Sequence, residues 1–138
     1  MSQATAPSKA TALYILIVED NQDSALSLQM LLEAMGYEVG VVHDGERAVA
    51  RALARPPDVI LMDIGLPRMN GYEAARQIRA GTPADARTKT TIIALTGWGQ
   101  ESDRRQSAEA GIDHHLVKPL DLAELTRLLE PGSRAASA

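Results

Sequence analysis

The chain has 138 residues, of which 45% are hydrophobic, and this share excludes a fully disordered chain and fits one domain. Its formal net charge of −4 argues against nucleic-acid binding, which needs a basic surface, and the lack of cysteine excludes disulfide scaffolds and thiolate metal sites. No apolar run approaches the roughly 20 residues of a membrane span, and the N-terminus lacks the pattern of a signal peptide, so we expect a cytoplasmic protein without a membrane partner.

Apolar runs alternate along the chain with stretches of helical periodicity. The runs predict five strands, at 13–18, 37–42, 58–62, 91–95 and 114–117. The intervening stretches predict five helices, at 21–35, 44–55, 71–80, about 100–110 and 121–130. Residues 1–11 and 131–138 are small and polar and are predicted to be disordered tails. The domain itself should therefore span 12–130.

Five strands that are each followed by a helix predict an α/β fold, a doubly wound parallel sheet with helices on both faces. The helix at 21–35 is predicted from apolar residues at helical spacing, namely Leu28, Leu31, Leu32 and Met35. The helix at 100–110 differs, because residues 101–107 offer almost no apolar stripe. Such a helix should be loosely held. It is either a well-solvated surface helix or an element that moves.

Polar side chains stand where four of the predicted strands end. They are Glu19 and Asp20, Asp63, Thr96 and Lys118. In a parallel sheet the carboxyl ends of all strands lie at one edge, so these five side chains should converge. Three grouped carboxylates are costly without a cation, and carboxylate oxygens are ligands that Mg²⁺ prefers. The set predicts a site for a divalent cation and a phosphoryl group.

Four segments carry a resemblance to a known family. They are IVEDN at 17–21, LMDIGLPRMNG at 61–71, ALTG at 94–97 and LVKPL at 116–120. In residues, order and spacing they resemble the receiver domain of two-component response regulators, and 110–119 is especially similar to receivers of hybrid sensor kinases. The resemblance covers roughly 13–130. It implies a flavodoxin-like fold with strand order 2-1-3-4-5, an order that general accounts of doubly wound sheets already give for a chemotaxis receiver.

The resemblance also implies roles for the residues of the site. Asp63 would accept a phosphoryl group from a phosphohistidine of a sensor histidine kinase or histidine phosphotransfer protein. Asp20 and Asp63 would bind Mg²⁺ or Mn²⁺ directly, Glu19 would act mainly through water, and the Gly65 carbonyl would complete the protein ligands. A cation is needed because carboxylate and phosphoryl group are both anionic.

Lys118 would pair with Asp63 at rest and with the phosphoryl oxygens afterwards, while the Thr96 hydroxyl would donate a hydrogen bond to one of those oxygens. Receivers usually have the peptide bond before the proline that follows this lysine in cis, here Pro119. His115 departs from the family, which often has Tyr or Phe there. It is either a plain half-exposed strand histidine or the switch residue. Trp98 is either loop filler or a shield that keeps water from Asp63.

The predicted function is a single-domain response regulator whose output is altered binding to an unknown protein target. It would not be an enzyme, since it assists only its own phosphorylation and dephosphorylation. One alternative is a receiver excised from a hybrid sensor kinase. Another is an aspartyl-nucleophile phosphohydrolase, but that chemistry wants a second acid where this chain has Gly65. A degenerate receiver that only binds partners is the third, and the presence of all five site residues argues against it.

Overall fold

The computed structural model describes residues 13–82, 90–97 and 104–130. These residues form one five-stranded parallel sheet of β2 (Tyr14–Val18), β3 (Glu38–Val42), β4 (Val59–Asp63), β5 (Thr91–Thr96) and β6 (His114–Val117). The helices are α2 (Gln22–Ala34), α3 (Gly45–Ala54), α4 (Gly71–Gly81), α5 (Arg104–Ala110) and α6 (Leu122–Leu129). The strand order β3-β2-β4-β5-β6 confirms the predicted order 2-1-3-4-5.

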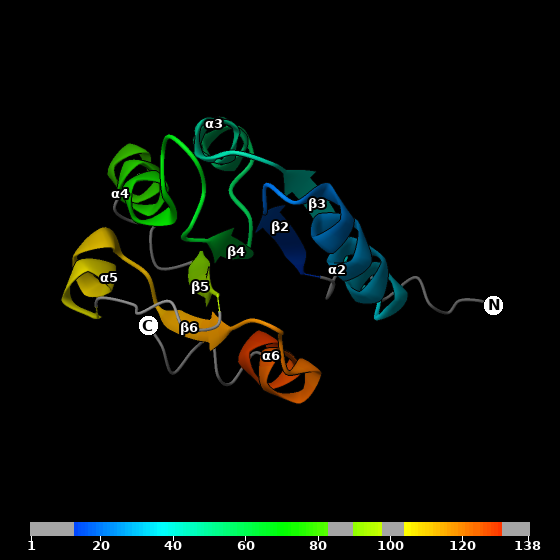
Figure 1. The fold of residues 1–138 in the computed structure, drawn as a ribbon. Helices are drawn as coiled ribbons and strands as arrows, with labels where there is room; N and C mark the ends of the chain where they lie inside the picture. The colour runs from blue at the N-terminus through cyan, green and yellow to red at the C-terminus, as the bar shows by residue number, and fades with distance from the viewer. Residues whose placement is uncertain (1–12, 83–89, 98–103, 131–138) are drawn as a thin grey trace.

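The sheet separates two apolar layers, with α3, α4 and α5 on one face and α2 and α6 on the other (Figure 1). Side chains of β4 point alternately into the two layers. Ile60 and Met62 pack in the layer of α3, α4 and α5, and Val59 and Leu61 pack in the layer of α2 and α6. Strands buried on both faces read as continuous apolar runs, which is why they were recognisable. The layer under α3 and α4 is rich in small side chains: Ala48, Ala52, Ala74, Ala75 and Ala94.

Asn or Asp begins four of the helices in the described part of the chain. Asn21, Asp44, Asn70 and Asp121 precede α2, α3, α4 and α6, and each side chain accepts a hydrogen bond from a backbone N–H in the first turn. Such caps satisfy N–H groups that otherwise lack a partner. Because these helices follow strands β2, β3, β4 and β6, the caps lie along the carboxyl edge of the sheet.

Helix α2 buries only part of the stripe of apolar residues that marks it in the sequence. The predicted helix is present, and Ala25 and Leu32 are fully buried, but Leu31 is 40% and Met35 38% exposed. The reason is that α2 covers one end of the sheet, over β2 and β3, where the described residues place no other element against its outer side. A hydrophobic period alone does not reveal how much of a helix face the rest of the fold covers.

Helix α5 is described from Arg104 onward, and its buried side chains are the small Ser107 and Ala110. This agrees with the weak apolar stripe predicted for it. The two predicted tails and Trp98 lie outside the described residues. Among the helices that the structure describes, none has the length and apolar character that crossing a bilayer requires.

Candidate functional site

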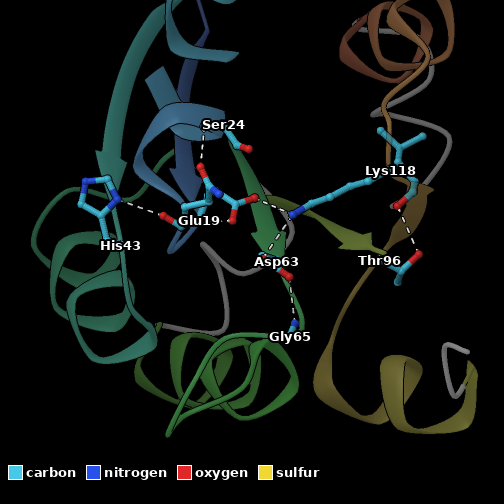
Figure 2. Close-up of polar contacts among 9 residues, drawn as sticks. Glu19, Ser24, His43, Asp63, Gly65, Thr96 and Lys118 are labelled. Carbon is cyan, nitrogen blue, oxygen red and sulfur yellow. Dashed lines mark hydrogen bonds and ion pairs between the residues drawn. The ribbon is translucent and has the colours of Figure 1, made fainter. Parts of the chain in front are cut away.

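The carboxyl edge of the sheet brings together the three predicted acids and the lysine. Glu19 directly follows β2, Asp63 is the last residue of β4, and Lys118 directly follows β6 (Figure 2). Glu19 and Asp63 are buried, with 5% and 8% of their surface exposed, whereas Asp20 is exposed. One carboxylate oxygen from each acid lies within 4.8 Å of the others. The structure thus gathers acids that are 44 residues apart in the chain into one cluster.

Lys118 contacts two of these acids. Its Nζ lies 2.5 Å from Glu19 Oε1 and 3.2 Å from Asp63 Oδ2. The Asp63 contact matches the predicted pairing, and the shorter Glu19 contact was missed. Burial lowers the pKa of Lys118, but hydrogen bonds and charges from Glu19 and Asp63 outweigh it, so the pKa lies above the ordinary lysine value. The ammonium group is therefore charged at neutral pH.

Asp63 is held through both of its carboxylate oxygens. Oδ1 accepts a hydrogen bond from the Gly65 backbone N–H at 2.8 Å, and Oδ2 accepts the one from Lys118. These two hydrogen bonds fix the plane of the Asp63 carboxylate. The N–H of Gly65 is the group engaged here, and the ligand role of its carbonyl stays a prediction.

Burial disfavours the charged form of Glu19. Burial raises its pKa and the negative charge of Asp63 raises it further, while hydrogen bonds from Lys118 and the Asn21 N–H lower it, and the net pKa is raised. One ammonium group thus compensates only part of the charge of three carboxylates. An all-oxygen, anionic donor set of this kind fits a hard divalent cation such as Mg²⁺ or Mn²⁺.

Thr96 is the last residue of β5 and is buried. Its hydroxyl donates a long hydrogen bond of 3.5 Å to the Leu116 carbonyl of β6, so its predicted bond to a phosphoryl oxygen stays a prediction. The Lys118–Pro119 peptide bond is cis, as the family resemblance implied.

His115 is half-buried on β6, and its Nε2 lies 2.7 Å from the hydroxyl oxygen of Ser107 in α5. Ser107 is buried, and a buried hydroxyl needs a partner. The histidine therefore ties the edge strand to the weakly apolar helix. Its role as the switch residue stays a prediction.

Comparisons with known proteins agree with this fold and site. The sequence model of the response regulator receiver domain matches residues 15–130, and the chain belongs to this family. It is similar in structure to the receiver domain of sensor histidine kinase PA1611 from Pseudomonas aeruginosa PAO1, with 41% identity and a TM-score of 0.74 over 86% of this chain and 94% of that one. That receiver holds a magnesium ion coordinated in its active site cleft.

Two curated relatives show where such a domain occurs. The response regulator ArlR of Staphylococcus epidermidis is 37% identical over 111 residues, which are 80% of this chain and 48% of ArlR. The virulence sensor protein BvgS of Bordetella bronchiseptica is 33% identical over 138 residues, 98% of this chain and 11% of BvgS. The chain thus spans about half the length of the first relative and a small part of the second. A receiver domain of two-component signalling, the predicted family, is confirmed.

Proposed function

We propose that Asp63 accepts a phosphoryl group from a phosphohistidine of a sensor histidine kinase or histidine phosphotransfer protein. The observation that carries this proposal is the environment of Asp63. It is a buried strand-end carboxylate, held by Gly65 and Lys118, with two further acids within reach of one cation. In the transfer, an Asp63 oxygen bonds to phosphorus as the P–N bond to histidine breaks. Water later releases phosphate and restores the carboxylate.

The residues around Asp63 divide the remaining tasks. Glu19, Asp20 and Asp63 would hold Mg²⁺ or Mn²⁺, with the Gly65 carbonyl as a further proposed ligand. When bound, the cation reduces the repulsion between the anionic carboxylate and phosphoryl group. The Lys118 ammonium donates first to Asp63 and then to the phosphoryl oxygens, and the buried Thr96 hydroxyl donates to another of these oxygens. The chain acts as an acceptor and not as an enzyme on other molecules.

A groove of about 680 Å³ beside the site is the proposed approach of the phosphodonor protein. Glu19 and Lys118 form its polar end, and Leu28, Leu31 and Leu120 are among its apolar lining. A protein that presents a phosphohistidine beside an apolar surface would cover this groove and bring the phosphorus to Asp63. The exposed Leu31 of α2 would then be a contact residue and not an unexplained apolar side chain.

The output of phosphorylation is proposed to be altered binding of another protein, in the cytoplasm. We favour a single-domain response regulator. The similarity to PA1611 and BvgS favours a second candidate, the receiver part of a hybrid sensor kinase. In either case the proposed chemistry at Asp63 is the same.

Labelling with acetyl phosphate and Mg²⁺ tests the proposal. Wild type should gain the mass of one phosphoryl group, which hydroxylamine removes as it does from an acyl phosphate. Asp63→Asn should gain none, whereas the control Asp23→Asn, at an exposed acid of the nearby α2, should be labelled like wild type. Labelling of Asp63→Asn, or labelling at full rate in excess chelator, would contradict the proposal. Catalytic turnover of p-nitrophenyl phosphate would favour the phosphohydrolase instead.

A further inference from the structure

The loop that carries Glu19 and Asp20 is held by the end of the neighbouring strand β3. The Glu19 N–H donates to the Val42 carbonyl at 3.1 Å. The Glu19 carbonyl oxygen lies 2.9 Å from Nδ1 of His43, the residue that follows β3 (Figure 2). Both backbone groups of Glu19 are therefore bonded to two consecutive residues of the adjacent segment.

The direction of the histidine bond follows from its partner. A carbonyl oxygen only accepts, so Nδ1 of His43 must carry the proton and donate it. His43 is exposed, so its ring adds little to the apolar core. It is also outside the acidic cluster found among the described residues, and its Nδ1 is already engaged. Its contribution to the site therefore passes through the Glu19 carbonyl and not through direct binding of a ligand.

That carbonyl belongs to the peptide group that joins Glu19 to Asp20. Because a peptide group is planar, fixing the direction of its oxygen fixes the whole plane and limits rotation at both flanking Cα atoms. The Cβ directions of both acids follow from these rotations. One hydrogen bond at this oxygen thus constrains two carboxylates of the cluster at once, whereas a contact to either side chain would constrain one.

We propose that His43 is a positioning residue of the acidic site, which sets divalent-cation affinity by orienting the Glu19–Asp20 peptide. The inference rests on the cation-binding role proposed above. Loss of this hydrogen bond lets the peptide plane rotate. Cation binding must then also fix the orientation of Glu19 and Asp20, and this entropic cost weakens the binding. Because the bond reaches the backbone of a ligand residue and not its side chain, we expect His43→Ala to weaken Mg²⁺ binding about three- to tenfold, below the range typical of side-chain partners.

Isothermal titration of the full chain with MgCl₂ and with MnCl₂ tests this. His43→Ala should show the weaker binding, and His43→Asn should stay within about twofold of wild type, because the Asn amide nitrogen replaces Nδ1 as donor. The control Gln22→Ala changes an exposed neutral residue beside the same loop and should bind like wild type. Unfolding midpoints in EDTA should be similar for all four proteins, because His43 is exposed and water can replace its hydrogen bond to the Glu19 carbonyl.

The outcomes separate this inference from the function on which it rests. If wild type binds neither cation, the proposed metal role itself fails. If wild type binds but His43→Ala binds equally well, the positioning role is overturned and the metal role stands. A His43→Asn variant as weak as His43→Ala would overturn it too, because restoring the donor should restore affinity. So would a midpoint in EDTA that falls equally in both variants, since that marks a role in general stability.

Discussion

Replacing Lys118 by Met removes the ammonium group from between two acids while keeping an apolar stem of similar length. Two charge-assisted hydrogen bonds disappear, to Glu19 at 2.5 Å and to Asp63 at 3.2 Å. Each such bond contributes roughly 1.5–3 kcal/mol in buried settings. The Lys118 side chain is 32% exposed, so water replaces part of this, and we expect a net loss of about 1–3 kcal/mol without metal.

The loss should depend on the cation. In EDTA the variant keeps three carboxylates without their compensating charge, and its unfolding midpoint should fall by roughly 3–10 °C. Mg²⁺ supplies positive charge to the same acids, so the difference from wild type should shrink when it is added. By linkage, a gap that closes by about 1.4 kcal/mol means roughly tenfold tighter Mg²⁺ binding by the variant.

Calorimetric unfolding in EDTA and in Mg²⁺ measures both effects. Arg127→Met is the matched control, because it removes one positive charge from an exposed position on α6 and should change stability by less than about 0.5 kcal/mol. Equal stability of the Lys118 and Arg127 variants in EDTA would refute the reasoning. So would a loss that Mg²⁺ leaves unchanged, because the charge of the site would then not be its cause.

Three further predictions concern residues that hold the helices around the site in place. Urea denaturation measures the free energy of unfolding of each variant. Arg79→Met removes hydrogen bonds from α4 to the loop before β6 and should lower the free energy of unfolding by about 1–3 kcal/mol; an unchanged value would contradict this. Gly71→Ala would place a Cβ 2.6 Å from the Ile64 Cα, a contact that forces the backbone apart and should cost about 1–3 kcal/mol; a more stable variant would contradict it. Ser107→Ala should cost about 1 kcal/mol by removing the hydroxyl group that contacts His115, and hydrogen exchange should quicken in α5 and not in α2.

The strand ends were predictable from sequence for a physical reason. A strand buried on both faces is a continuous apolar run, so the polar residue that ends it, such as Asp63, is visible as a break. Parallel topology then brings such breaks to one edge, which explains why Glu19 and Asp20 were grouped with Asp63 correctly. The strand order and the cis bond at Pro119 were known only through the family resemblance, since no local pattern distinguishes them.

The sequence did not predict two side-chain contacts of the site, from Lys118 to Glu19 and from His43 to the Glu19 carbonyl. Lys118 follows β6, and both β4 and β5 separate that strand from β2, yet its side chain reaches Glu19. Nothing in the spacing of 99 residues encodes this. His43 was missed because a lone histidine after a strand carries no motif, and its partner is a backbone carbonyl that is the same in every residue. Trp98 stays a prediction, outside the described residues.

The alanine-rich layer under α3 and α4 has a consequence for Asp63. The small alanine side chains let α4 pack close to the sheet, and their size sets the distance between the helix and the strands. The first residue of that helix, Gly71, donates its N–H to the Ile64 carbonyl, one residue beyond Asp63. Thickening the layer at Ala74 or Ala75 would lift α4 and pull on this bond. The alignment of Asp63 therefore depends on the size of the side chains in this layer.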